Sequence, residues 1–264
     1  MPSVETLAVA LLGFYATGYF VLAGADIGTG MVAPYLGRTD RERRLVIASF
    51  APFLLGNEVW LVATAGVFVG CFPVLEGELL TGQFAVVVPL LAGWVVRDAG
   101  LWLRGRVTGR AGQGWRAGCD GAVVCGSWTV ALAWGWLLAG VLGGTPGRLA
   151  TGAVAVVTSV AVAALFAAHG LGFAAARLTG PPYERARRLV GRTRAGGSFA
   201  LTAVLMAAVP VAAGTALPLA GAAADGATLG LLVPALLVVT PLLVAVQAGT
   251  WWVFRHRVTG PSYL

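Results

Sequence analysis

The sequence contains no lysine and few charged residues of any kind. Charged residues make up 11% of the 264 positions, whereas hydrophobic residues make up 58% and the mean hydropathy is +0.84. A soluble globular domain usually has about 25% charged residues. The shortage of charge therefore excludes an ordinary soluble protein, and no stretch is polar enough to form a separate soluble domain.

Histidine and cysteine are also scarce. Of the two histidines, His169 and His256, the second lies in a basic C-terminal segment, so we expect no bis-histidine haem site within this chain. The three cysteines, Cys71, Cys119 and Cys125, form no CxxC pair. We therefore expect neither a disulfide nor a metal site, and interpret all three as small buried apolar residues.

Long apolar runs, in contrast, are abundant. A membrane-spanning helix needs about 20 mostly apolar residues, and runs of this length occur seven times. The sequence therefore predicts an all-α polytopic membrane protein, a helical bundle that forms a single integral membrane domain over residues 1–264. We expect the helices at roughly 6–34, 52–72, 80–103, 120–143, 150–176, 197–219 and 228–253.

The arginines lie in alternate connections of this seven-helix arrangement. Of the 18 basic residues, 16 fall in four segments, 38–44, 104–116, 177–194 and 255–257. The positive-inside rule then predicts that the N-terminus is outside and the C-terminus is cytoplasmic. The net charge of +7 could suggest nucleic acid, but this periodic placement indicates membrane orientation and no nucleic-acid partner.

Two arginine-rich segments predict short helices outside the bilayer. Thr39 and Glu42 have the spacing of a capping box, which predicts a helix that lies along the inner surface until Pro52 redirects the chain into the membrane. The prolines at 181–182 should break the preceding helix. Residues 183–194 favour a surface helix against anionic headgroups.

The ionisable residues predicted inside the membrane all lie in the cytoplasmic half of the bundle. At a rise of about 1.5 Å per residue, they lie about 8 to 15 Å from the inner ends of their helices. Charged groups in hydrocarbon are costly and usually functional. The pattern therefore predicts either a proton-conducting half-channel or a structural network. The residues concerned are Asp26, Glu58, Arg97, Asp98 and His169, with Asn57 and Trp60 beside Glu58.

We favour a structural role for Arg97, because a cation in lipid must find a partner, here Glu58 or Asp26. Asp26 and Glu58 are as consistent with proton transfer as with structure. Asp98 adjoins Arg97 but points about 100° further round the helix, so it need not be its partner. Asn57 and Trp60 are expected to have structural or electrostatic roles.

Two further polar residues have simpler interpretations. Asp120 is expected to open the fourth helix at the inner surface, as a charge at a helix N-terminus. His169 is expected to be a hydrogen-bonded core or relay residue. Gly24 and Gly28 form a GxxxG motif, which indicates close helix packing at least as strongly as function.

Several short motifs along the chain match one family of membrane proteins. In the first half of the chain they are residues 25–31, 36–40, 42–44, 56–61 and Arg97. In the second half they are Asp120 and residues 126–127, 168–170, 246–248 and 252–255. Together they resemble subunit II of cytochrome bd-type quinol oxidases. The resemblance runs from end to end and is most specific in the first hundred residues.

The resemblance implies a non-haem subunit of a quinol:oxygen oxidoreductase in the bacterial cytoplasmic membrane. It would stabilise a haem-bearing subunit I in a heterodimer, with the quinol pool and the lipid bilayer as further partners. Haem b and haem d would lie in the partner, with no complete active site in this chain alone. The resemblance is also compatible with a bound structural quinone. Acidic residues of the family contribute to a cytoplasmic-side proton path, for which the candidates are Asp26, Glu58, Asp98 and His169.

The sequence departs from the family pattern at several points. Leu55 stands where the family usually has an aspartate, and Trp102 falls at the position of a carboxylate near the end of the third helix; Asp98 would be a substitute at a different position. The family typically has nine helices, so the pair before the last helix is expected to be missing from a shortened, divergent member. These departures favour, as an alternative, a repurposed complex with a different redox substrate. A small transporter or channel is a third hypothesis, weakened because no inverted repeat is evident.

Overall fold

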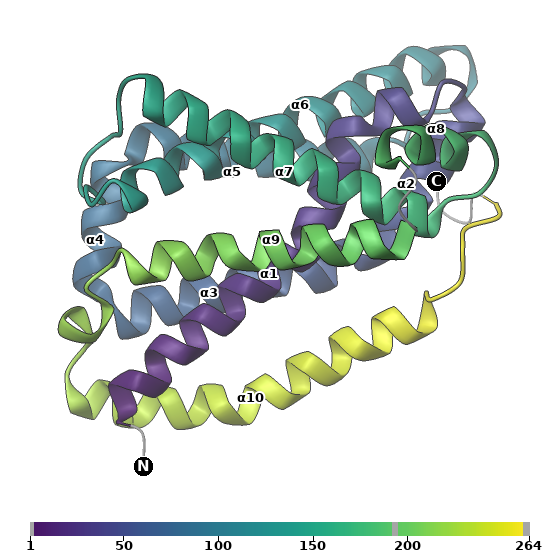
Figure 1. The fold of residues 1–264 in the computed structure, drawn as a ribbon. Coiled ribbons are helices and arrows are strands. Elements are labelled where there is room, and N and C mark those ends of the chain that lie inside the picture. Colours follow the sequence, from purple (N-terminus) through teal and green to yellow (C-terminus); the bar gives the residue numbers. More distant parts are fainter. Residues whose placement is uncertain (1–2, 192–194, 261–264) are drawn as a thin grey trace.

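The computed structural model describes residues 3–191 and 195–260, which form a bundle of long helices (Figure 1). The helices are α1 (Val4–Leu36), α2 (Asp40–Phe50), η1 (Ala51–Phe53, a 3-10 helix), α3 (Leu54–Cys71), α4 (Pro73–Gly82), α5 (Phe84–Leu103), α6 (Gly109–Leu142), α7 (Ala153–Arg177), α8 (Gly180–Val190), α9 (Ala195–Thr215), η2 (Leu219–Ala222, a 3-10 helix) and α10 (Gly226–Val253).

Seven of these helical segments are long and apolar enough to cross a membrane, which confirms the predicted number. They contain α1, α3, α5, α6, α7, α9 and α10. The predicted third span, 80–103, began too early, because the short helix α4 ends at Gly82 and Gln83 separates it from α5. The remaining bounds, apart from that of α6, differ from the predicted ones by a few residues.

Helix α1 lies at the centre of the bundle. It packs against α3, α6, α7, α9 and α10, whereas α5 packs mainly against α6, and α10 packs mainly against α1 and α3 among the long helices. Figure 1 shows α10 along one side of the molecule, and the N- and C-termini at opposite ends. This placement means that residues of α1 can reach side chains from most of the other spans.

Close contact between α1 and α7 depends on glycine. A methyl group at Gly28 would overlap the backbone carbonyl oxygen of Phe166, and one at Gly170 would overlap the backbone of Gly28. Thr29 Oγ1 also donates to the carbonyl oxygen of Gly170 at 3.2 Å. The GxxxG motif of α1 is therefore part of a helix-packing contact.

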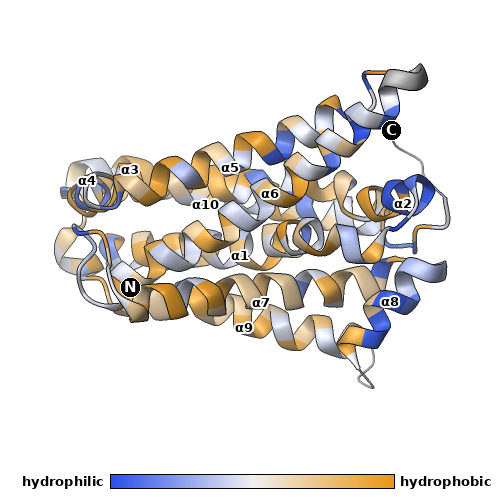
Figure 2. Ribbon diagram, turned by 90° about the horizontal axis from the view of Figure 1, so that it is seen from above, coloured by the Kyte–Doolittle hydropathy of each residue, from blue (hydrophilic) through white to orange (hydrophobic). Residues whose placement is uncertain are grey.

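The predicted short helices are present at the end of the bundle that carries the C-terminus (Figure 1). Helix α2 begins with the predicted capping box, in which Thr39 accepts from the backbone N–H of Glu42 and Glu42 accepts from the backbone of Thr39. Pro52 lies in the 3-10 turn that joins α2 to α3. Figure 2 shows α2 and α8 as the most hydrophilic helices of this end.

Helix α8 begins earlier than predicted. Helix α7 ends at Arg177, and the two prolines at 181–182 occupy the first turn of α8, where they cost no hydrogen bond. Helix α8 also ends earlier, at Val190 with Gly191 as its C-cap, and the last residues of the predicted helix 183–194, 192–194, lie outside the described part of the chain.

Two sequence predictions are wrong in this region. Asp120 does not open a helix, because α6 begins at Gly109 and places Asp120 three turns inside. Residues 109–119 contain no proline to prevent helix formation, and Trp115 donates to the carbonyl oxygen of Leu103 at 2.7 Å, which holds this extension against the end of α5. Cys125 is exposed, unlike the buried Cys71 and Cys119.

Candidate functional site

A buried arginine on α5 brings together three carboxylates from three helices. The Arg97 side chain is 1% exposed, and its guanidinium pairs with Asp26 of α1 and, at 3.1 Å, with Asp98 of α5. Glu58 Oε1 of α3 lies 3.9 Å from Arg97 Nη1. We refer to Arg97, Asp26, Glu58 and Asp98 as the Arg97 cluster. Of the two alternative partners that the sequence suggested, Asp26 pairs closely with Arg97 and Glu58 lies at the longer distance, and the neighbouring Asp98 is a partner as well.

The carboxylates of the cluster differ in exposure. The Asp26 side chain is 2% exposed, whereas those of Glu58 and Asp98 are 17% and 21% exposed. Glu58 also accepts a hydrogen bond from Trp94 Nε1 at 3.2 Å. The cluster therefore extends from the centre of the bundle, at Asp26, to its surface, at Glu58 and Asp98.

A chain of side-chain amides continues from Asp26 to α10. Asn57 Nδ2 donates to Asp26 Oδ2 at 2.9 Å and to the carbonyl oxygen of Leu22 at 3.0 Å. Gln247 Nε2 donates to Asn57 Oδ1 at 3.0 Å, and Trp60 Nε1 donates to Gln247 Oε1 at 3.2 Å. Asn57 thus contacts the cluster directly, whereas Trp60 is connected to it through Gln247 and Asn57. No role for Gln247 was predicted from the sequence, in which its signal is a polar amide within the apolar run of the last span.

His169 lies apart from the Arg97 cluster. Its Nε2 is 2.9 Å from the carbonyl oxygen of Val21 and its Nδ1 is 2.8 Å from Thr202 Oγ1. Because a carbonyl oxygen only accepts, Nε2 carries a proton. The ring also stacks on Phe199 at a centroid distance of 4.7 Å. With both nitrogens engaged, His169 does not fit an axial haem ligand, and this geometry is that of a buried link between α1, α7 and α9.

Asp120 belongs to a second ionic network, at the end of the bundle that carries α2. Arg104 Nε donates to Asp120 Oδ1 at 2.6 Å, and its Nη2 donates to Asp40 Oδ1 at 3.2 Å. Arg43 Nε lies 3.1 Å from Asp120 Oδ2. These contacts join α2, α5 and α6. Arg104 follows Arg97 by seven residues on α5, so the two networks share one face of that helix, about 10 Å apart.

Helix α8 is attached to the same end by an ion pair. Arg185 Nη1 lies 2.7 Å from Glu42 Oε2 and also donates to the carbonyl oxygen of Leu36 at 2.6 Å. The hydrogen bond to the Glu42 carboxylate raises the pKa of Arg185 above its usual value. The arginines of connections far apart in the sequence therefore meet at one end of the bundle.

The positions at which the sequence departs from the expected acids are exposed and apolar. Leu55 is 60% exposed and Trp102 is 54% exposed. Among the described residues, no group of three histidine, cysteine, aspartate or glutamate side chains could hold a metal ion.

Comparison with known proteins connects these residues to one family. Residues 4–223 match the model of the family described as cytochrome bd terminal oxidase subunit II. This range contains the whole Arg97 cluster and ends before α10. Gln247 and the predicted likeness of the last helix to the family therefore lie outside the match.

Curated relatives of the same kind are similar over shorter stretches. Cytochrome bd-I ubiquinol oxidase subunit 2 of Escherichia coli (strain K12) is 32% identical over 136 residues, which are 52% of this chain and 35% of the relative. Cytochrome bd ubiquinol oxidase subunit 2 of Bacillus subtilis (strain 168) is 35% identical over 107 residues, 40% of this chain and 32% of the relative. The matched segments thus cover about a third of the length of these relatives. Because the family match extends over most of the sequence, the chain belongs to the cytochrome bd terminal oxidase subunit II family.

Proposed function

We propose that this chain is the non-haem subunit of a membrane quinol:oxygen oxidoreductase, in which it stabilises a haem-bearing subunit I and contributes a proton path from the cytoplasmic side. The relatives from Escherichia coli and Bacillus subtilis are both subunits 2 of ubiquinol oxidases, which supports a heterodimer that draws on the quinol pool. In this proposal the haems lie in the partner.

The observation that carries the proposal is the exposure of two carboxylates within the spans. Glu58 and Asp98 are partly exposed at the surface of the bundle, although both lie in membrane-spanning helices. A carboxylate that faces lipid is costly. A partner subunit that covers this face would remove that cost, and the exposed apolar side chains of Val59 and Val95 nearby on α3 and α5 would pack against it.

The same arrangement suits proton transfer. Asp26, Glu58 and Asp98 surround one buried guanidinium, so a proton that arrives at one carboxylate has two further acceptors within the same cluster. The arginine-rich end of the bundle lies about 10 Å away along α5, and the positive-inside rule makes this end cytoplasmic. In this proposal protons enter there and leave through Glu58 and Asp98 toward the partner.

The test of the assembly is affinity purification of this chain from its native membrane, followed by an optical spectrum of the preparation. We expect a haem-bearing partner to co-purify, with the absorption band of haem d at the red end of the visible spectrum. A colourless preparation, or a partner without haem, would contradict the proposal.

A repurposed complex with another redox substrate is the second candidate. It is favoured by Leu55 and Trp102, two exposed apolar side chains at positions where the resemblance implies acids. The same preparation distinguishes the two candidates, because a partner that binds haem but consumes no dioxygen with quinol would support the repurposed complex.

A further inference from the structure

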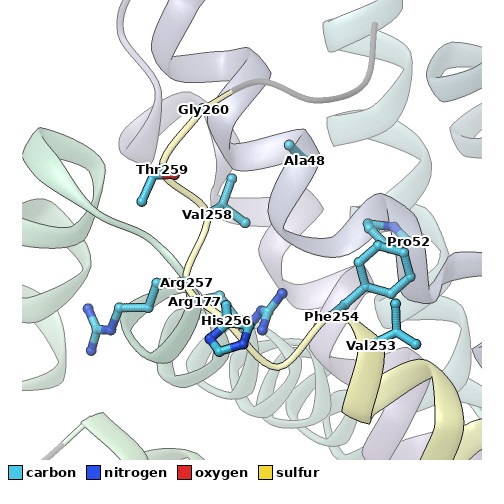
Figure 3. Close-up of a pocket in the computed structure, with 10 residues that line it drawn as sticks. All are labelled: Ala48, Pro52, Arg177, Val253, Phe254, His256, Arg257, Val258, Thr259 and Gly260. Atoms are coloured by element: carbon cyan, nitrogen blue, oxygen red, sulfur yellow. The ribbon is translucent and has the colours of Figure 1, made fainter.

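A cavity of about 250 Å³ lies at the arginine-rich end of the bundle (Figure 3). It is lined by the last turn of α7 at Arg177, by Ala48 of α2, by Pro52 in the turn before α3, and by most residues of the C-terminal segment 253–260. It is separate from the Arg97 cluster and from the network around Asp120, neither of which contributes a lining residue.

Arg177 is the buried charge of this cavity. The residue is 6% exposed, and its guanidinium carbon lies 5.2 Å from the centre of the Phe53 ring. Among the described residues, no carboxylate lies within 4.0 Å of this guanidinium, and its buried Nε has no hydrogen-bond partner. A buried cation without a counter-charge is unfavourable. The carbonyl end of α7 compensates only part of it, because the macrodipole effect is small at a helix terminus.

The wall of the cavity is held in place by hydrogen bonds to backbone carbonyl oxygens. Val258 N donates to the carbonyl oxygen of Arg177 at 2.9 Å, and Thr179 Oγ1 donates to the carbonyl oxygen of Val258 at 2.7 Å. Arg257 Nη1 donates to the carbonyl oxygen of Leu178 at 3.0 Å, and Figure 3 shows its guanidinium pointing away from the other lining residues. The C-terminal segment is thus fixed against the end of α7, with His256 beside the cavity.

The lining carries positive charge and no negative charge. Arg177 contributes this charge, the guanidinium of Arg257 lies at the edge and points away, and no aspartate or glutamate is among the described lining residues. Val253, which is 58% exposed, lines the cavity at the end of α10. The cavity therefore opens where an apolar membrane helix meets the arginine-rich surface, the level of lipid headgroups.

We propose that this cavity binds the phosphate group of an anionic phospholipid headgroup, with Arg177 as its main ligand. Guanidinium groups bind phosphate oxygens through paired hydrogen bonds, which would give the Nε of Arg177 a partner. Free phosphate has the same chemistry, so the experiment includes it as a separate arm.

The experiment uses the full chain, purified in detergent together with its partners. Dioctanoyl phosphatidylglycerol is titrated and its saturable adducts are counted by native mass spectrometry, while inorganic phosphate is titrated by calorimetry. We expect Arg177→Gln to weaken phosphatidylglycerol binding at least 10-fold. The matched control is Arg255→Gln, an exposed arginine above Trp252 that does not line the cavity; it should change binding less than twofold.

A third variant separates binding from folding. Ala48→Leu fills the cavity and leaves Arg177 in place, so it should also abolish saturable binding, even where Arg177→Gln fails to fold. Binding of phosphate alone that depends on Arg177 would assign the site to free phosphate and overturn the lipid assignment. Equal lipid binding by wild type, Ala48→Leu and Arg177→Gln, or no saturable binding at all, would overturn the proposal.

Discussion

At the scale of single residues, Arg97 binds its three carboxylates in different surroundings. Asp26 is buried, pairs with Arg97 and accepts from Asn57, so it completes a fully buried ion pair. Glu58 is further from the guanidinium, partly exposed, and accepts from Trp94. These differences lead us to separate a structural role for Asp26 from a functional role for Glu58.

We predict that Glu58→Gln slows quinol-driven dioxygen consumption at least about 10-fold, because a proton-transfer group typically contributes about 10² to 10⁴ in rate. Stability should change by only about 1 kcal/mol, since the amide oxygen of glutamine can still accept from Trp94. Turnover of the purified complex, with its yield from size-exclusion chromatography, measures both effects.

Two variants control this experiment. Glu78→Gln replaces an exposed glutamate of α4 and should leave turnover unchanged. Asp26→Asn should instead reduce the yield of folded complex, because removing one partner of a buried ion pair costs about 3 to 5 kcal/mol. If the Glu58→Gln complex dissociates, or turns over at the normal rate, Glu58 is not a proton-transfer residue.

At the scale of helices, the sequence predicts where the apolar spans lie and where a capped helix begins. It does not predict which partner a long side chain contacts. The seven spans follow from runs of about 20 apolar residues, and the start of α2 follows from Thr39 and Glu42.

The start of α6 was not predicted, because its arginine-rich first turns resemble a polar loop. These turns are helical and extend beyond the apolar span. The bond between Arg97 and Asp98 was missed because helical spacing gives the direction of Cβ and not the path of a long side chain. The role of Gln247 could not be predicted, because the sequence does not show which face of α10 meets α3.

The contact between α1 and α7 gives a prediction at this scale. A methyl group in Gly28→Ala would overlap the carbonyl oxygen of Phe166 and lie 2.8 Å from the backbone nitrogen of Gly170. The backbones must then separate, at a cost of about 1 to 3 kcal/mol. We expect a lower thermal unfolding midpoint for the purified protein in detergent. Gly13→Ala, in the same helix with nothing within 4 Å of the added carbon, should be neutral or slightly stabilising; equal midpoints for the two variants would contradict the packing role of Gly28.

At the scale of the whole molecule, charge is distributed along the bundle axis. Arg104 reaches Asp40, and Arg185 reaches Glu42, so basic residues from connections far apart in the sequence share one end. The N-terminus lies at the other end (Figure 1). The positive-inside rule predicts that the arginine-rich end is cytoplasmic, and the direction of the proposed proton path depends on that prediction.

Labelling of introduced cysteines tests the assignment. In a background without the three native cysteines, Glu184→Cys places a thiol on α8, at the arginine-rich end, and Glu78→Cys places one on α4, at the other end; both positions are exposed. In right-side-out membrane vesicles, a membrane-impermeant maleimide should label Glu78→Cys and not Glu184→Cys. Both should react after detergent is added, which shows that each thiol is accessible. The opposite pattern would place the arginine-rich end outside, and the Arg97 cluster would then lie nearer the outer surface, where it could not receive protons from the cytoplasm by the short route along α5.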